Sequence, residues 1–266
     1  MARGAARVEP VANAPAATAD YDGGRALVVG DYHAGIEAGL RYERGVELPS
    51  NGDERRQRLV TLLDRTVADR LVLLGDLGHR IGSTEGAEQA EIQALYTAVV
   101  DERDVPITVA PGNHDGGLTD LWADRASVDI LPQSGGLLGS EPGGVGLFHG
   151  HTWPDPTLLS ADVVCMAHEH PTVKLTDSVG GYRTEKTWLR GRLDRKKMAE
   201  GVGCEPAELE WRDPQLVVLP AFNDRSGGTW VNVEGERFLA PFLADALVDG
   251  ELYLLDGTRL GAYQSV

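Results

Sequence analysis

All seven histidines of this chain lie in short motifs that are rich in Gly, Asp or further His. In chain order these motifs are Asp31-Tyr32-His33, Gly75-Asp76-Leu77-Gly78-His79, Gly112-Asn113-His114-Asp115, His149-Gly150-His151 and His168-Glu169-His170. Imidazole nitrogens and carboxylate oxygens are common protein ligands of divalent metal ions. Because the motifs extend from residue 31 to residue 170, only the fold can bring them together. The distribution therefore predicts a metal site.

The individual motifs differ in what they can ligate. Asp31 and His33 follow an apolar run, and alternate residues of a strand point the same way, so both side chains can reach one ion. Taken alone this pattern is weak, because a single His at a strand end is more often a satisfied polar group. The other motifs add a carboxylate, an amide oxygen and three imidazoles: Asp76, Asn113, His149, His168 and His170. Such a mixed set suits a pair of divalent ions better than one structural zinc.

The apolar runs before the first three motifs predict buried strands. Residues 25–31 and 70–76 each end in an acid, and residues 106–110 precede the third motif. Between them, residues 53–69 and 88–102 carry Leu, Ile and Val at helical spacing. Apolar strands that alternate with helices predict a parallel sheet covered on both faces, with ligands outside the carboxyl ends of its strands. The His and Asp motifs fall at those ends.

The second half of the chain has a different residue pattern. A short helix is predicted for residues 118–125, and after it short strands separated by Gly and Pro predict a second sheet. These strands are expected at residues 145–149, 162–167, 215–220, 229–233, 237–243 and 251–255. Residues 187–204 stay unassigned because they hold a basic cluster: Arg190, Arg192, Arg195, Lys196 and Lys197. The cluster could contact a nucleic-acid backbone, although a solvated face is the simpler interpretation.

Length and composition limit the class of protein. With 266 residues and 42% hydrophobic content the chain can bury a full core, and we expect one domain over residues 25–266. Residues 1–24 are expected to form an N-terminal arm, partly ordered or an edge strand. No apolar stretch approaches the roughly 20 residues of a membrane-spanning helix, which predicts a cytoplasmic protein without membrane contact. Cys165 and Cys204 provide neither a disulfide framework nor a Cys-based zinc site.

As an ordered set, the five motifs resemble those of the calcineurin-like metallophosphoesterase superfamily, which run D-x-H, G-D-x-x-(D/H), G-N-H-(D/E), H and G-H-x-H. The resemblance covers residues 25–171. Residues 31–37, 75–79, 168–171 and 219–223, with Gly227-Gly228, look like the ICC-like phosphoesterase branch, relatives of the DNA-ligase-associated metallophosphoesterases. The chain departs from the family at Ala167, where the family usually has Gly before His-x-His.

The resemblance implies a fold and a metal-ligand set. The fold would be a four-layer α/β/β/α sandwich, in which two mixed sheets pack together with helices outside. Two divalent ions are implied, with Mn²⁺ as the first choice and Fe²⁺ or Zn²⁺ as alternatives. The ligands of the first ion would be Asp31, His33 and His170, and those of the second Asn113, His149 and His168, with Asp76 as the bridge.

The resemblance also implies a hydrolase acting on a phosphate ester, a phosphodiester before others, by attack of a metal-bridging hydroxide. His114 would contact the phosphate and protonate the leaving oxygen, and Asp115 would orient its ring. His79 and His151 are candidates for substrate contact, with support of a metal ligand as the alternative. Nucleic acid is one candidate substrate. The competing functions are a phosphomonoesterase for small nucleotides and a non-catalytic metal-binding scaffold.

Two further features allow more than one interpretation. Glu37 and Arg41 lie one helical turn apart, and a solvated ion pair is favoured over a phosphate-binding Arg with its orienting carboxylate. Asn223, Gly227 and Gly228 could form a turn close to the site or an ordinary loop between two strands.

The chain is strongly acidic. It has 41 acidic and 25 basic residues, only four of which are lysines, and a formal net charge of -16. Such a surface repels itself at low ionic strength but is tolerated in concentrated salt, where the Debye length falls to about 3 Å. Because Asp and Glu recur throughout the chain, we interpret the charge as halophilic adaptation rather than as a docking face for a basic partner.

This interpretation predicts salt-dependent stability. Lowering the salt from molar concentration to about 0.1 M should lower the melting temperature, because the Debye length grows to roughly 10 Å and acidic groups then repel one another. Thermal melts across a salt series test this, with divalent metal saturating throughout because loss of a bound ion would also destabilise the fold. A melting temperature that is constant, or rises as salt is removed, would favour the docking face instead.

Overall fold

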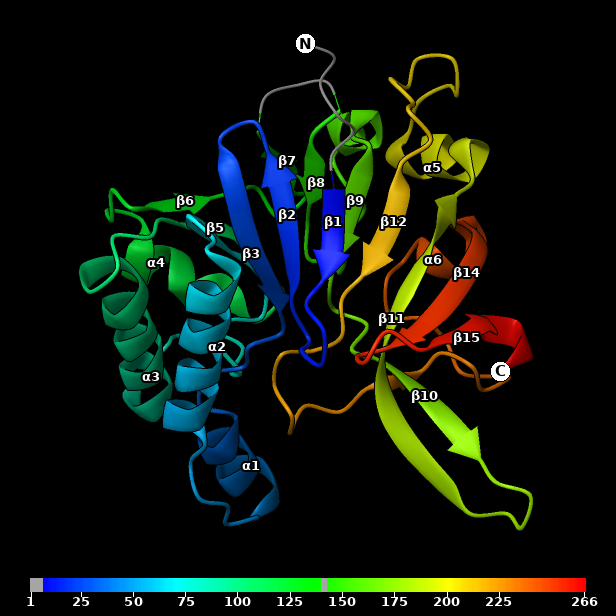
Figure 1. Cartoon of the computed structure of the whole chain (residues 1–266). Helices are drawn as coiled ribbons and strands as arrows, with labels where there is room; N and C mark the ends of the chain where they lie inside the picture. The colour runs from blue at the N-terminus through cyan, green and yellow to red at the C-terminus, as the bar shows by residue number, and fades with distance from the viewer. Residues whose placement is uncertain (1–6, 140–142) are drawn as a thin grey trace.

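The computed structural model describes residues 7–139 and 143–266, so residues 1–6 of the expected N-terminal arm lie outside the described residues. The described chain forms two mixed β-sheets that pack face to face, with helices against their outer faces (Figure 1). The predicted four-layer α/β/β/α sandwich is therefore confirmed. Among the described residues, none of the helices is both long enough and apolar enough to cross a bilayer.

The first sheet contains the strands that precede the first three His motifs. Its described strands lie in the order β1 (Arg7–Pro10), β2 (Ala17–Tyr21), β3 (Gly24–Gly30), β4 (Arg70–Leu74), β5 (Ile107–Ala110) and β6 (Val128–Ile130). Strands β3 to β6 are parallel, as predicted for β3, β4 and β5. The N-terminal segment contributes β1 at the edge and β2 beside β3, both antiparallel to their neighbours.

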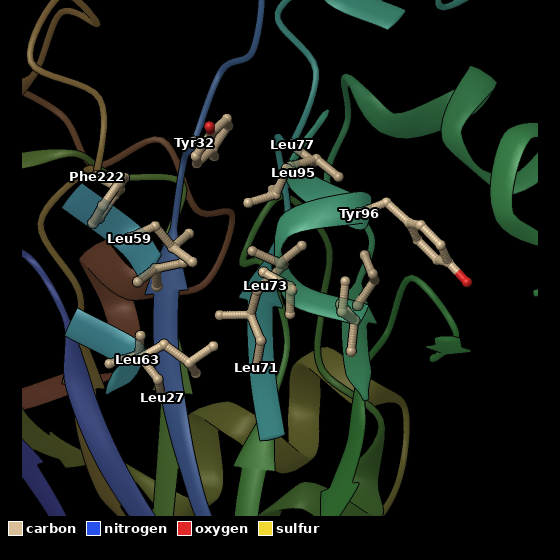
Figure 2. Packing of buried hydrophobic residues seen from close by; sticks show 14 of the residues in the cluster. Leu27, Tyr32, Leu59, Leu63, Leu71, Leu73, Leu77, Leu95, Tyr96 and Phe222 are labelled. Carbon is tan, nitrogen blue, oxygen red and sulfur yellow. The ribbon is translucent and has the colours of Figure 1, made fainter. Parts of the chain in front are cut away.

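Helices cover the outer face of this sheet. The predicted helices are confirmed as α2 (Gly52–Thr66), α3 (Gly86–Tyr96) with the π-helical turn η1 (Thr97–Asp101), and α4 (Leu118–Trp122). Leu59 and Leu63 of α2 pack in one buried cluster with Leu27 of β3 and Leu71 of β4 (Figure 2). Helix α1 (Ile36–Arg44), which carries Glu37 and Arg41, directly follows the first motif, and the 3-10 turn η2 (Asp115–Gly117), which was not predicted, follows the third.

The second sheet carries the last two His motifs. The order of its main path is β13 (Thr229–Trp230), β10 (Pro171–Thr176), β11 (Tyr182–Leu193), β12 (Gln215–Val218), β9 (Val163–Met166), β8 (Val145–Leu147) and β7 (Gly136–Leu138). Strand β14 (Leu247–Leu254) pairs with β11, and β15 (Arg259–Ala262) pairs with β14. Helices α5 (Arg195–Val202) and α6 (Leu243–Ala246) pack on the outer face, and η3 (Pro156–Ser160) and η4 (Tyr263–Ser265) are 3-10 turns.

The structure corrects one predicted strand and assigns one open segment. Residues 187–204 form the end of β11 and helix α5. Residues 237–243, predicted as a strand, are irregular and lead into α6. The buried Glu169 carboxylate accepts hydrogen bonds from the backbone N–H groups of Leu239 and Ala240, so these donors are not used in a sheet ladder.

The two sheets enclose an apolar core of mainly small and branched side chains. Val28 and Val72 from the first sheet lie in one buried cluster with Leu147, Cys165 and Val217 from the second. The Cys165 thiol is fully buried, and burial raises its pKa to about 12, which makes it unreactive. This core holds the carboxyl ends of β3 and β9 against each other: a Cβ at Gly30, the last residue of β3, would collide with Ala167. The small side chain at Ala167 fits only because residue 30 is Gly.

Candidate metal centre

The five His motifs meet at one edge of the molecule, where parallel strands of both sheets end. Asp31 follows β3, Asp76 lies two residues after the end of β4, and the register pairs the last residues of these strands, Gly30 and Leu74. In the second sheet His149 follows β8 and His168 follows β9, which are also parallel neighbours. The ligand-bearing loops of two sheets are thus brought to one place by the packing of the core between them.

Four of the predicted ligands form a first cluster. Asp31, His33, Asp76 and His170 each place one ligand atom within 4.8 Å of all the others. His170 Nε2 lies 3.2 Å from Asp31 Oδ1 and 3.3 Å from His33 Nε2. His33 Nε2 lies 3.9 Å from Asp76 Oδ2. Three of these side chains are buried, so the cluster is largely shielded from solvent.

A second cluster shares Asp76 with the first. It contains Asp76, His149 and His168. His149 Nε2 lies 3.5 Å from Asp76 Oδ1 and 3.2 Å from His168 Nδ1. The two oxygens of Asp76 thus face different clusters, which is the arrangement that a bridging carboxylate requires.

Asn113 is placed beside the second cluster, with an exposed side chain. Its neighbour His114 donates its backbone N–H to Asp76 Oδ1 at 3.0 Å. Gly112, which precedes Asn113 in the chain, is equally close, because a Cβ at this position would collide with the same oxygen of Asp76. Asn113 is therefore next to Asp76 in space, and its role as a ligand stays a prediction.

The chemistry of the clusters fits divalent cations. Within the described residues, Asp31 Oδ2 is buried and has no hydrogen-bond partner. Burial lowers the pKa of His33 to about 3 and that of His168 to about 4, so both rings are neutral and carry a free lone pair at pH 7. Burial would raise the pKa of Asp31, but nearby His170 lowers it below its usual value. Ionised carboxylates and neutral imidazoles are the ligand forms that such cations bind.

The backbone of the ligands differs from the predicted extended strand. Asp31 and His33 have φ angles of 55° and 48°, and Asp76, His168 and His170 also lie in the left-handed region. Asp31 and His33 are therefore not alternate residues of one strand, as predicted, because β3 ends at Gly30. Left-handed backbone at residues other than Gly costs about 1–3 kcal/mol each, so the surrounding structure must hold it.

Asn223 holds the turn that carries Asp31 and His33. It is fully buried, and its Nδ2 donates to the carbonyl oxygens of Tyr32 at 2.9 Å and His33 at 3.2 Å. Its backbone N–H donates to the Asp31 carbonyl at 3.0 Å. The segment around Asn223 is thus a turn close to the site, and the ordinary-loop interpretation is wrong.

Carbonyl oxygens orient two of the imidazoles. His149 Nδ1 donates to the Leu74 carbonyl at 2.9 Å, and His170 Nδ1 donates to the Gly227 carbonyl at 2.8 Å. A carbonyl can only accept, so in both rings Nδ1 carries a proton and Nε2 faces its cluster. Burial would lower the pKa of His149, but the hydrogen bond and charge of Asp76 raise it to about 9, so a metal ion bound at Nε2 would displace the proton there.

Asp115 does not orient the His114 ring as the sequence suggested. Its buried carboxylate accepts backbone N–H groups of Leu77 at 2.9 Å, Gly78 at 3.2 Å and Gly112 at 2.8 Å. Asp115 therefore joins the loop after β4 to the loop after β5. The atom that orients His114 is the His79 carbonyl oxygen, which accepts a hydrogen bond from His114 Nδ1.

His79 and His151 border different clusters. The His79 ring lies edge-on to His33, with centroids 5.4 Å apart, and stacks on His114 at 6.0 Å. The His151 ring lies 5.4 Å from His149. Both rings contact predicted metal or catalytic residues, and contact with a substrate stays a prediction for each.

A buried ion cluster supports the first motif from behind, and sequence reasoning missed it. Glu37 pairs with Arg55 at 3.3 Å and with Arg225 at 3.1 Å, while Arg55 also pairs with Glu91 of α3 at 2.8 Å. Glu91 in turn accepts the Gly35 N–H. The predicted solvated pair of Glu37 with the next turn of its helix is therefore wrong. A signal was present, because Glu91, like Glu88, lies on the face of α3 that carries Ile92 and Leu95.

Comparison with known proteins agrees with this geometry. A model of the calcineurin-like phosphoesterase family matches residues 24–197, so the chain belongs to this family and is a hydrolase of phosphate esters. A search of curated proteins gives no match. Nuclease MPE from Pseudomonas putida is similar in fold, with 19% identity, a TM-score of 0.53 and coverage of 94% of this chain and 98% of that chain. Yfce, a phosphoesterase from E. coli, has 14% identity and a TM-score of 0.42, with coverage of 89% and 97%. At 19% identity the likeness to nuclease MPE shows the fold alone.

The shared position of Asp76 gives a first prediction for the site. Asp76→Asn should lose both metal ions and hydrolytic activity, because one carboxylate faces both clusters and its charge is removed. Metal analysis of the purified variant measures this, with Asp53→Asn as the matched control on an exposed side chain. An Asp76→Asn protein that keeps two ions per chain and near-normal turnover would show that Asp76 is not the bridge.

Asn223 gives a second prediction. Asn223→Ala removes two hydrogen bonds that hold the Asp31–His33 turn, so Mn²⁺ should bind the first cluster about 10- to 100-fold more weakly. Calorimetric titration of metal-free protein with Mn²⁺ measures the affinity directly. Asn232→Ala is the matched control, since that side chain also joins backbone groups, of Lys174, but away from the clusters. Equal affinities in the parent and Asn223→Ala would contradict the assigned role.

Proposed function

We propose that the chain is a divalent-metal-dependent phosphodiesterase with two ions in its site, Mn²⁺ in the first instance. The observation that carries the proposal is the pair of ligand clusters that share the Asp76 carboxylate. Asp31, His33 and His170 would complete the site of one ion, and Asn113, His149 and His168 that of the other. Bound there, two divalent ions supply a nucleophile from water at neutral pH and neutralise charge on the phosphoryl oxygens.

The ionised state of Asp76 supports this role. Burial would raise the pKa of its carboxyl, but the hydrogen bond and charge of His149 and the nearby imidazoles hold the pKa well below its usual value. The carboxylate is therefore charged at neutral pH. Its side chain is 4% exposed, so its charge acts in a medium of low dielectric constant, where electrostatic interactions are stronger than in water.

His114 is the residue that we assign to proton transfer. The ring is held through Nδ1 by the His79 carbonyl, and its Nε2 lies 3.8 Å from Asp76 Oδ2, at the border of the first cluster. The side chain is 22% exposed, more than Asp76, so an incoming substrate can reach it. As the imidazolium, His114 can donate its Nε2 proton to the leaving oxygen while the Nδ1 hydrogen bond keeps the ring in place.

An assay panel tests the function. The protein would be incubated with Mn²⁺ at molar salt and given an aryl phosphodiester, an aryl phosphomonoester, cyclic nucleotides and single-stranded DNA. We expect faster hydrolysis of diesters than of the monoester. Exclusive turnover of the monoester would make the chain a phosphomonoesterase, and no turnover of any ester would leave a metal-binding scaffold.

The role of His114 predicts a dependence on the leaving group. His114→Ala should keep both metal ions, while turnover of an alkyl phosphodiester falls by about 10² to 10⁴. A nitrophenyl diester should lose less, because nitrophenolate leaves without needing a proton. Kinetics on both substrates with metal analysis of the same preparation measure this. An equal loss on good and poor leaving groups would exclude His114 as the acid.

A further inference from the structure

The basic side chains at residues 190–197 form ion pairs and hydrogen bonds within the protein. Arg192 lies 3.4 Å from Asp213 and 3.6 Å from Asp249. Lys196 and Lys197 both pair with Glu200 of the same helix. Arg190 and Arg195 donate to the backbone carbonyl oxygens of Val8 and Leu209. The cations that were candidates for nucleic-acid contact therefore have partners within the protein. The other two of the four lysines, Lys174 and Lys186, lie elsewhere and share one surface.

That surface is one face of a projecting β-hairpin. Strand β11 pairs with β10 over residues 182–186 and with β14 over residues 187–193, so the first part of β11 and β10 extend beyond the body of the sheet (Figure 1). Partners in an antiparallel ladder point to the same face of a sheet. The register pairs Thr172 with Lys186, Lys174 with Thr184, and Thr176 with Tyr182. Trp230 of β13 pairs with Thr172 and joins the same face.

The hairpin begins at the metal centre. Pro171, its first residue, follows the predicted ligand His170. At the base of the face, Lys186 Nζ donates to the carbonyl oxygens of Ala221 at 2.7 Å and Asn223 at 2.8 Å, and Asn223 holds the Asp31–His33 turn. Lys174 stands four residues beyond His170, which is about 13 Å along an extended strand. The face therefore leads away from the site by the length of a short polymer segment.

Three side chains on this face form a cation–aromatic group. Lys174 Nζ lies 4.5 Å from the centre of the Tyr182 ring and 5.0 Å from that of Trp230. The two ring centroids are 6.4 Å apart, and Tyr182 is 61% exposed. An exposed aromatic ring of this kind fills no core. Aromatic rings beside a cation are what bind the bases and backbone of unpaired nucleic acid.

We propose that Lys174, Tyr182 and Trp230, here called the hairpin platform, bind a single-stranded nucleic-acid segment while one of its phosphodiesters lies at the metal centre. The proposal rests on the phosphodiesterase function and names its substrate class. Bases stack on the exposed Tyr182 ring and the half-buried Trp230 ring, and Lys174 neutralises a phosphate. An unpaired strand is required, because base faces are free to stack only outside a duplex.

The acidic composition of the chain favours stacking over charge as the source of affinity. Contacts between cations and phosphates weaken steeply as salt concentration rises, whereas stacking on aromatic rings is not a charge interaction. A protein with a net charge of -16 also repels a polyanion over most of its surface. A platform with two aromatic rings and one lysine can bind a strand at high salt and on a protein whose acidic surface repels polyanions.

The test compares a polymer with a small substrate on the same variants. Kinetics would be measured with Mn²⁺ at molar salt for a single-stranded oligodeoxynucleotide and for bis(nitrophenyl) phosphate, which is too short to reach the platform. For Tyr182→Ala, the ratio of kcat/KM on the oligonucleotide to kcat/KM on the small diester should fall about tenfold, mainly through a higher KM. Tyr182→Phe keeps the ring and should keep the ratio. Val179→Ala, 88% exposed on the same hairpin, is the matched control.

Binding without turnover separates the two proposals. Fluorescence anisotropy of a labelled single strand, with chelator present, should show weaker binding to Tyr182→Ala and Lys174→Ala than to Tyr182→Phe and the parent. If the parent hydrolyses no diester but these binding differences appear, the phosphodiesterase function fails and the platform stands. If the parent hydrolyses the small diester while Tyr182→Ala treats the strand as the parent does, the platform is overturned. Equal affinity of the parent for duplex and single strand would also overturn it.

Discussion

The Asp76 carboxylate is the contact on which the rest of the site depends. Its two oxygens face different clusters, and His33, His114 and His149 approach it within 3.9 Å. These close approaches leave no room for a side chain at some positions of the surrounding loops. A Cβ at Gly112 would collide with the carboxylate itself, and one at Gly75 would collide with the His149 ring. Glycine at these two positions is what lets the chain pass close enough for one carboxylate to serve two clusters.

The site stores backbone strain that the fold compensates. Asp31, His33 and Asp76 adopt left-handed conformations directly after rigid parallel strands, which turns their side chains toward one point. Buried polar groups from distant segments hold these turns: Asn223 binds the carbonyls around His33, and Glu169, between two predicted ligands, is anchored to residues 239–240. Behind them, the Arg55 cluster connects the first motif to α2 and α3. The predicted ligands are thus placed by an extended polar framework that the two-sheet core keeps in register.

The local residue pattern was enough to predict the strands and helices that depend on short-range interactions along the chain. The apolar runs before Asp31 and Asp76 became β3 and β4, the Leu spacing of residues 53–69 became α2, and the order of the motifs along parallel strands was enough to predict that their side chains meet. Long-range pairing escaped prediction. Asn223 acts on a turn 190 residues away, and the partner of Glu37 is Arg55 on the next helix rather than its own helix neighbour. Residues 237–243 have strand-like composition, yet Glu169 takes two of their backbone donors, which only the tertiary structure reveals.

The most direct test of the account is a crystal structure of the protein with Mn²⁺, using anomalous scattering to locate the ions. The account predicts two anomalous peaks on each molecule, one among Asp31, His33 and His170 and one beside His149 and His168, with Asp76 between them. The parent protein suffices, and no substrate is needed. A single peak, or peaks that leave Asp76 without contact to both ions, would contradict the claim that one carboxylate organises a two-ion centre.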